Sequence, residues 1–295
     1  MRKFLSAAVF AAALTLIISS CSFKDSSDEK EARTPATSQP FTEREVEDAD
    51  GTYIFDNANL LGPGDGIACN DYACWLYRKK LINTAVITVN DLGGKTPYDY
   101  ALDEYNRLYE GKGSGIVVLV NNATNNDIVF KTGACLTNIS QKAQDNAVYW
   151  ATKEFIDGNY RRGIMRLLQL AELCPENIVD NADVFDGEQL TKLQKGLSTC
   201  DGSVMLIASC NNSETSNENI LKSYYARRYY SENGIMLMLE TNSKKIIAFS
   251  DDGFTEKFKT ALDKANELAA KEDYYGAVTE VIESLGGKVP SEKKK

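Results

Sequence analysis

An internal repeat is the feature of this sequence that most constrains its fold. An apolar segment runs into Asp-Asn-Ala at residues 56–58, and the same pattern returns 124 residues later at 180–182. Residues 115–133 then hold a glycine, an apolar strand, a polar turn, a second strand and a closing glycine, and residues 234–253 repeat this order. Self-similarity at a fixed interval is typical of a duplicated structural unit.

A third pair of matching segments closes each copy. Residues 160–168 and 274–282 both begin at a tyrosine and continue with apolar residues at helical spacing. Matches in the same order predict two copies of one domain, with the boundary near Pro175, where the preceding helix must stop. We expect the first copy to span residues 51–174 and the second, more divergent copy to span 177–287, followed by a charged tail at 288–295.

Each copy is expected to be an α/β domain. Residues 85–89 and 116–120 are nearly continuous apolar, β-branched runs, as in strands that are covered on both faces. Helical patterns surround these strands in the first copy, at residues 74–81, 98–109, 141–156 and 162–173. The predicted fold is two tandem three-layer α/β/α domains, each built on a small mixed sheet.

The N-terminus has the pattern of a bacterial lipoprotein signal. Arg2 and Lys3 precede an apolar stretch at residues 4–18, and Cys21 follows small residues where cleavage is expected. The favoured interpretation is a removed signal peptide at 1–20 and a lipid on Cys21; the alternative is an ordinary secretory signal with an incidental cysteine. Residues 21–50 are polar and predict a flexible stalk.

These features predict a protein that is lipid-anchored and extracytoplasmic in the bacterial cell envelope, with the anchor as its contact to the membrane. The formal net charge is −9, and loss of the first twenty residues, which carry two basic residues and no acid, makes it −11. Such an acidic chain repels phosphate backbones, so nucleic acid is excluded as a partner.

Six cysteines remain after Cys21, and in an exported protein an even number predicts disulfides, with fifteen full pairings possible. A predicted strand at 203–208 separates Cys200 from Cys210 by roughly 15–20 Å, too far for a bond between them. Cys69 and Cys74 can pair if the chain turns between them, and we favour this pair. The six are Cys69, Cys74, Cys135, Cys174, Cys200 and Cys210.

The chain contains no histidine. This absence excludes Ser-His-Asp and Cys-His catalysis, histidine-ligated metals and phosphatases with a histidine nucleophile. Any hydrolysis would depend on carboxylates, tyrosines, cysteines or a hard metal ion.

The motifs of the first copy, taken in order, resemble the TPM domain family. They are the Asp-Asn-Ala segment at 56–58, Asp-Leu-Gly at 91–93, the strand that begins at Gly115, Gly133, and Asp-Gly-Asn-Tyr-Arg-Arg-Gly at 157–163. The resemblance implies an extracytoplasmic α/β/α domain that is often tethered to a membrane. It also implies phosphatase activity and divalent-cation binding, which are known for some members. The glycines and proline at 62–66 and two cysteines depart from the family's opening helix.

Asp56, Asn57 and Asp91 are the candidate metal ligands. Asp91 directly follows a strand, at the sheet edge where α/β folds place ligands. Carboxylate and amide oxygens suit Ca²⁺ or Mg²⁺. The alternative is that these side chains form local turns or cap the next helix.

Two further clusters have a structural alternative. Asp180, Asp183 and Asp186 would share one side of a helix, although a solvated acidic face explains them equally. The glycine-rich segment at 111–115 lacks the spacing of a phosphate loop and precedes a strand, so it predicts a tight turn.

A run of tyrosines and arginines in the second copy predicts an interface. On a helix Tyr225 and Tyr229 share one face, and Tyr224 and Arg228 share another. Exposed Tyr and Arg often anchor protein interfaces. Packing of one pair against the sheet is the alternative.

The sequence therefore favours a non-catalytic accessory module of the cell envelope that binds a protein partner or a ligand. The alternative is a divalent-metal-dependent phosphatase that acts through Asp56 and Asp91. The acidic surface opposes the second hypothesis, because it repels phosphate substrates.

Overall fold

The computed structural model describes residues 46–124, 127–210, 217–229 and 232–290. The expected signal peptide, the lipidation residue Cys21 and most of the expected stalk lie outside these residues. In the described ranges no helix is long and apolar enough to cross a membrane.

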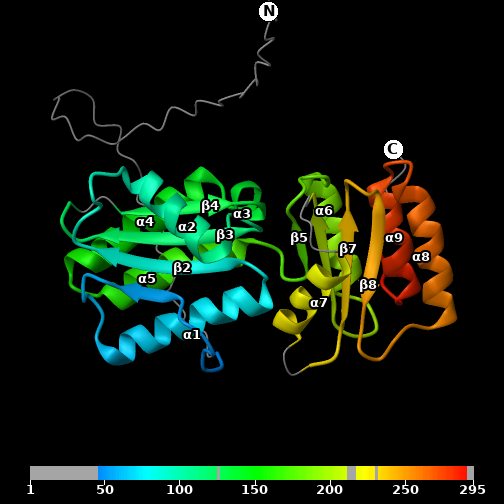
Figure 1. Ribbon diagram of the computed structural model, residues 1–295, viewed down its shortest axis with the longest axis horizontal. Coiled ribbons are helices and arrows are strands. Elements are labelled where there is room, and N and C mark those ends of the chain that lie inside the picture. The colour runs from blue at the N-terminus through cyan, green and yellow to red at the C-terminus, as the bar shows by residue number, and fades with distance from the viewer. Residues whose placement is uncertain (1–45, 125–126, 211–216, 230–231, 291–295) are drawn as a thin grey trace, which may run out of the picture. The chain divides into compact units, whose positions relative to one another are not determined.

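The first half of the chain forms one mixed sheet with its covering helices (Figure 1). Its elements are β1 (Ile54–Asp56), α1 (Pro63–Lys79), β2 (Asn83–Val89), α2 (Pro97–Tyr109), β3 (Gly115–Asn121), β4 (Ile128–Thr132), α3 (Ala134–Asn138), α4 (Gln141–Ile156), α5 (Tyr160–Leu168) and the 3-10 helix η1 (Gln169–Leu173). The strand order is β1-β2-β3-β4. The first three strands are parallel, and β4 returns antiparallel to β3.

The second half repeats this topology. Its elements are β5 (Ile178–Asp180), α6 (Gly187–Leu197), β6 (Val204–Ser209), α7 (Asn217–Arg228), β7 (Ile235–Glu240), β8 (Lys245–Phe249), α8 (Glu256–Ala269) and α9 (Tyr274–Ser284). The order is β5-β6-β7-β8, again with three parallel strands and one antiparallel return. Asp56 of β1 is paired with Thr88 of β2, and Asp180 of β5 is paired with Ala208 of β6. The two repeated aspartates therefore occupy equivalent positions in their sheets.

Helices cover both faces of the first sheet. Every residue of β2 and β3 is buried, as expected for parallel strands covered on both sides. On one face Val86 lies in the same buried cluster as Tyr72 of α1 and Ile164 of α5. On the other face Ile87 lies in a cluster with Tyr105 of α2.

The second sheet is covered in the same way. Leu206 shares a buried cluster with Leu193 of α6 and Val278 of α9, whereas Ile207 lies in a different cluster with Tyr225 of α7. Alternate residues of one strand thus face opposite helical layers. The prediction of two tandem three-layer α/β/α domains with small mixed sheets is confirmed.

The helices begin where the sequence provides caps. The Thr96 side chain accepts a hydrogen bond from the Asp99 N–H at the start of α2, and Pro97 occupies the first helical turn. Asp186 and Gln189 form a reciprocal capping box on α6. Asp186 is thus a helix cap, whereas Asp180 ends a strand. The aspartates at 180, 183 and 186 therefore do not share one side of a helix, and that sequence-based prediction is wrong.

Helix α1 differs from the expectation. The sequence predicted a helix over 74–81 after a disturbed opening, but α1 runs unbroken from Pro63 to Lys79. Pro63 is tolerated because the first helical turn needs no N–H from that residue. The glycines Gly64 and Gly66 leave open space at the helix surface. Each glycine lowers the stability of a helix by up to about 1 kcal/mol, and packing of the buried face of α1 offsets this loss.

Candidate ligand site at the carboxyl edge of the first sheet

The parallel strands of the first sheet end at one edge, where α/β domains commonly bind ligands. Strands β1 and β3 end at Asp56 and Asn121. The N-terminus of α5 borders a hollow that Leu60, in the loop after β1, also lines. This edge of the sheet is the candidate site.

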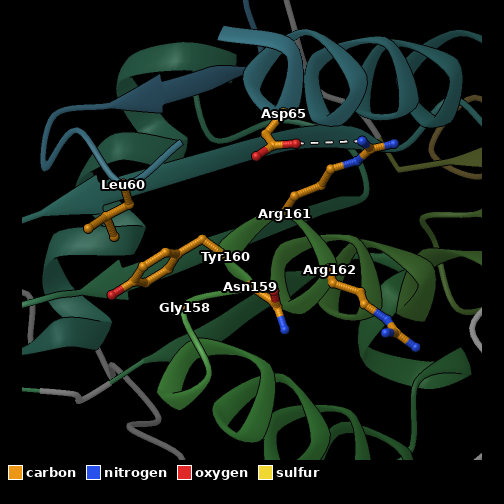
Figure 2. Close-up of a pocket in the computed structure, with 7 residues that line it drawn as sticks. All are labelled: Leu60, Asp65, Gly158, Asn159, Tyr160, Arg161 and Arg162. Atoms are coloured by element: carbon orange, nitrogen blue, oxygen red, sulfur yellow. Dashed lines mark ion pairs between the residues drawn. The ribbon is translucent and has the colours of Figure 1, made fainter. Parts of the chain in front are cut away.

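The first hollow at this edge has a volume of about 310 Å³ and is mostly polar. Arg161 extends toward Asp65 of α1, and the ion pair between Nη1 and Oδ1 spans 3.5 Å (Figure 2). Arg162 pairs with Glu154, with Nε 3.4 Å from Oε1. The hollow is lined by Leu60, Asp65, Gly158, Asn159, Tyr160, Arg161 and Arg162.

A second hollow, of about 320 Å³, shares Tyr160 with the first. The Tyr160 ring stacks on Phe155, with ring centroids 5.6 Å apart. Gly163 leaves room for the Phe155 ring, since a Cβ atom at this position would lie 2.2 Å from that ring. The second hollow is lined by Val120, Asn121, Asn122, Asp127, Thr152, Phe155, Ile156 and Tyr160.

Asp127 gives the second hollow a titratable group. Its Oδ1 accepts a hydrogen bond of 2.9 Å from the Asn121 N–H. Burial nevertheless raises the pKa of the Asp127 carboxyl to about 6, because desolvation disfavours the charged form. The site therefore combines amide, phenol, guanidinium and carboxyl groups that are suited to hydrogen bonding.

The repeated aspartate of β1 organises its own loop. Oδ1 of Asp56 accepts hydrogen bonds from the Leu60 N–H (3.0 Å) and from the Thr88 hydroxyl, and Oδ2 accepts one from the Leu61 N–H (2.9 Å). In the second domain Asp180 does the same, because its carboxylate accepts from the N–H groups of residues 182, 184 and 185. The shared role of this aspartate is loop formation.

The other predicted metal ligands, Asn57 and Asp91, are exposed. Oδ1 of Asp91 accepts a hydrogen bond of 2.9 Å from the Gly93 N–H, which forms a local turn. The backbone N–H of Asn57 donates to Phe55. Among the described residues no three His, Cys, Asp or Glu side chains gather closely enough to hold a metal ion. Since Asp56 is already engaged by three donors, these residues fit a divalent-ion site poorly.

In the tyrosine and arginine run, one predicted pair of side chains is buried and the members of the other pair are half-buried. Tyr225 and Tyr229 are only 5% and 4% exposed. Tyr225 packs edge-on against Phe249, and the Tyr229 hydroxyl donates to a backbone carbonyl of the second domain, with Ser203 O and Ile235 O both at 3.1 Å. Tyr224 is half-buried, and Arg228 lies over the Tyr229 ring at 5.2 Å. Packing against the sheet, the alternative that the sequence left open, explains the burial of Tyr225 and Tyr229.

Arg227 belongs to the same run but was not among the predicted interface residues. Its guanidinium makes both hydrogen bonds and a ring contact. The described residues of both domains belong to one compact unit. Within it the Arg227 guanidinium lies 3.3 Å from the ring centroid of Tyr77 in α1 and donates to the Tyr77 carbonyl and to Asn83 Oδ1. Burial lowers the pKa of this arginine, yet it stays charged at neutral pH. The run thus contacts the first domain of its own chain.

The expected turn between Cys69 and Cys74 is absent. Both residues lie on the unbroken helix α1, about 7.5 Å apart along its axis, which exceeds the separation that a disulfide tolerates. The Cys69 thiol contacts the Arg161 carbonyl at 3.9 Å, whereas the Cys74 thiol contacts Asp50 Oδ1 at 3.5 Å. The condition for pairing these two cysteines is therefore not met.

Sequence reasoning quoted the Tyr160 segment only as a motif and gave it no role. It also passed over Asn121 and Asp127, although the position of Asn121 at a strand end is a recognisable signal. In the second domain Glu240 takes the place of Asn121 and is buried, with no partner for Oε2 among the described residues. Burial raises the pKa of this carboxyl. The two edges therefore differ chemically although their folds agree.

The chain is a tandem α/β protein with a polar hollow at the carboxyl edge of the first sheet. Residues 54–172 match the family model of the TPM domain. These residues are a TPM domain; the second domain shares the strand order but lies outside the matched range.

Two solved structures resemble the chain in part. One is the solution NMR structure of the N-terminal domain of a protein from P. gingivalis, 17% identical, with a TM-score of 0.38, covering 42% of this chain and 83% of that one. The other is the N-terminal domain of a Corynebacterium glutamicum protein, 15% identical, with a TM-score of 0.32, covering 40% and 82%. No curated protein matches the chain.

Proposed function

We propose that this chain is a lipid-anchored accessory protein of the bacterial cell envelope. Cys21 carries the anchor, the polar segment after it spaces the domains from the membrane, and the TPM domain binds a partner protein or ligand at the carboxyl edge of its sheet. Two-signal lipid anchoring of this kind gives stable membrane attachment.

The position of Tyr160 carries this proposal. Its side chain lines two adjoining hollows, each above 300 Å³, which is the lower end of the size range of ligand pockets. Aromatic rings give large contact area at low entropic cost, and tyrosine adds a hydrogen bond. Ile156 borders the same surface and is 79% exposed, which adds an apolar contact for a partner.

The hydrogen bonds that the Asp56 carboxylate accepts favour a binding function over hydrolysis. A general base or metal ligand needs a lone pair directed at the substrate or ion. Oδ1 of Asp56 instead accepts from Leu60 N–H and the Thr88 hydroxyl, and the same use recurs at Asp180 in the second domain. A role in loop structure accounts for the repeated residue without catalysis.

A divalent-metal-dependent phosphatase is the second candidate. The name of the matching family model, TPM_phosphatase, favours it, whereas the hydrogen bonds of Asp56 oppose it. The test is thermal unfolding of the full chain with and without 1 mM Ca²⁺ or Mg²⁺. A site of about 10 μM affinity would add about 2.7 kcal/mol to the free energy of unfolding. A metal-dependent increase in the free energy of unfolding that Asp56→Asn abolishes would support the phosphatase. If the ions cause no increase, the chain lacks the metal site that this phosphatase requires.

A site-specific photo-crosslinker tests the binding site itself. We would place it at Ile156, beside the hollow, and at Tyr98, which is 47% exposed on α2. In intact cells we expect a discrete adduct from position 156 that disappears in Tyr160→Ala and is absent from position 98. Equal adducts at both positions, or an adduct insensitive to Tyr160→Ala, would contradict the proposed site.

The anchor has a separate test. Cells fed an alkyne analogue of palmitate should label the chain, and Cys21→Ala should abolish the label and release the protein from the membrane fraction. Labelling that persists in Cys21→Ala would show that the lipid is elsewhere.

A further inference from the structure

Two buried cysteines of the TPM domain lie against each other. The sulfur atoms of Cys135 and Cys174 are 3.8 Å apart, although the residues are 39 positions apart in sequence. Cys135 lies in α3 and is fully buried, and Cys174 directly follows η1 and is 4% exposed. Buried thiols that meet across such a sequence distance are placed for a covalent bond.

We propose that Cys135 and Cys174 form a disulfide bond when the chain folds under oxidising conditions. A bond requires the sulfurs to approach to about 2.05 Å, which side-chain rotation can supply from van der Waals contact. This assignment does not rest on the proposed binding function, because it uses residues away from Tyr160.

The chemistry is thiol–disulfide exchange with a small disulfide such as oxidised glutathione. The thiolate of one cysteine attacks a glutathione sulfur and releases one glutathione thiolate, which leaves a mixed disulfide on the protein. The second cysteine, as thiolate, then attacks the protein sulfur and releases the second glutathione. The two protein thiols lose two protons and two electrons in total, and the oxidised glutathione is reduced to two thiols.

Neighbouring groups favour the thiolate form of Cys174. Its pKa lies below the ordinary value because of its hydrogen bond with Cys135 and because Lys80 and Lys131 are close. The same contact raises the pKa of Cys135. Lys80 is held at this position by hydrogen bonds to backbone carbonyls, including one of 2.6 Å to Cys174 O. A lowered thiol pKa increases the thiolate fraction that reacts.

The other described cysteines have different neighbours. Cys69 and Cys74 are separated along α1, and the Cys200 thiol contacts the carbonyls of Gly196 and Ile282. Cys210 is exposed beyond the end of β6. A bond between Cys135 and Cys174 therefore leaves three of the fifteen full pairings that the sequence allowed.

The bond would close a loop that contains α4, α5 and η1. Both helices cover the first sheet and border the Tyr160 hollows. A crosslink of this length reduces the conformational freedom of the unfolded chain. It would also fix the segment that leads from η1 into β5.

The test is refolding of the reduced, full chain in a mixture of reduced and oxidised glutathione, followed by alkylation and tryptic mapping without reductant. Cleavage isolates Cys135 in peptide 132–142 and Cys174 in peptide 167–192, whereas Cys69 and Cys74 share peptide 45–78 and Cys200 and Cys210 share peptide 196–222. We expect peptides 132–142 and 167–192 to be joined, about 2 Da lighter than the sum of their thiol forms, and to separate on reduction.

Stability provides a second measurement. Oxidation should lower the equilibrium constant of unfolding by about 30- to 1000-fold in the wild type. Cys135→Ala should remove this redox dependence, and Cys69→Ala, which deletes a buried thiol elsewhere, should retain it. Alkylated, unlinked Cys135 and Cys174 in the refolded protein, or either of them linked to another cysteine, would overturn the proposal.

Discussion

A Cβ atom on Gly234 would lie 2.2 Å from Cε1 of Tyr229, because the tyrosine ring fills the space beside this glycine. The first domain has the same arrangement: a Cβ on Gly115 would lie 2.2 Å from Cε2 of Tyr105. In both domains the ring packs on the start of the third strand and its hydroxyl contacts backbone carbonyls. The repeated glycine is therefore explained by a repeated ring contact.

This contact predicts that Gly115→Ala and Gly234→Ala each destabilise the protein. The ring must move away from the strand, and overpacking of this kind costs about 1–3 kcal/mol. Urea unfolding measures the loss. Gly66→Ala is the matched control, since Gly66 lies in α1 with open space around it. It should raise the free energy of unfolding by up to about 1 kcal/mol through helix propensity. Wild-type stability of both strand variants would refute the shared contact.

The aspartates that end β1 and β5 give a second paired prediction. Asp56→Ala and Asp180→Ala should each lower the free energy of unfolding by about 1–3 kcal/mol, because loop N–H groups lose their acceptors. Asp91→Ala removes an exposed turn contact and should change stability by no more than about 0.5 kcal/mol. Denaturant titration compares the three. A larger loss for Asp91→Ala than for Asp56→Ala would contradict the loop role.

The repeat and the strands could be predicted from the sequence because their signals are local or periodic. Buried parallel strands appear as unbroken apolar runs, and the duplicated Asp-Asn-Ala and glycine positions identify the two copies. Helix α1 was predicted too short, since proline and glycine at its start are read as breakers. Only the tertiary structure shows that Pro63 occupies the first turn and that the helix buries Tyr72.

The side chains of the site could not be predicted in the same way. Helical spacing placed Tyr225 and Tyr229 on one face but gave no information on whether that face was covered. The hollows at Tyr160 depend on α5 meeting the loop after β1, a contact between residues about a hundred positions apart. The approach of Cys135 to Cys174 is likewise set by where η1 ends. Such contacts follow from packing, and a single sequence does not encode them as a pattern.

Arg227 provides a prediction on the contact between the two domains. Arg227→Ala removes a buried cation that stacks on Tyr77 and hydrogen-bonds to its carbonyl, so we expect a loss of about 2–4 kcal/mol. Lys79→Ala breaks only the exposed ion pair with Glu232 and should cost at most about 1 kcal/mol. Unfolding followed by tryptophan fluorescence and circular dichroism distinguishes the two variants. Equal, small losses would show that the stacked pair contributes little.

The raised pKa of Asp127 predicts a pH dependence with an unusual sign. The folded pKa is about 6, above the ordinary aspartate value of 3.8, so between these values the folded state binds more protons than the unfolded state. The contribution of Asp127 to stability therefore falls as pH rises from about 4 to 6, by up to about 3 kcal/mol, and no further above that.

Other carboxyl groups titrate in the same range, so the measurement is the difference between the wild type and Asp127→Asn. The amide keeps the acceptor for the Asn121 N–H but cannot ionise. Relative to the wild type, Asp127→Asn should gain stability steadily between pH 4 and 6 and keep a constant difference above pH 7. Parallel stability curves for the two proteins over this range would show that the Asp127 carboxyl is fully solvated when the chain is folded.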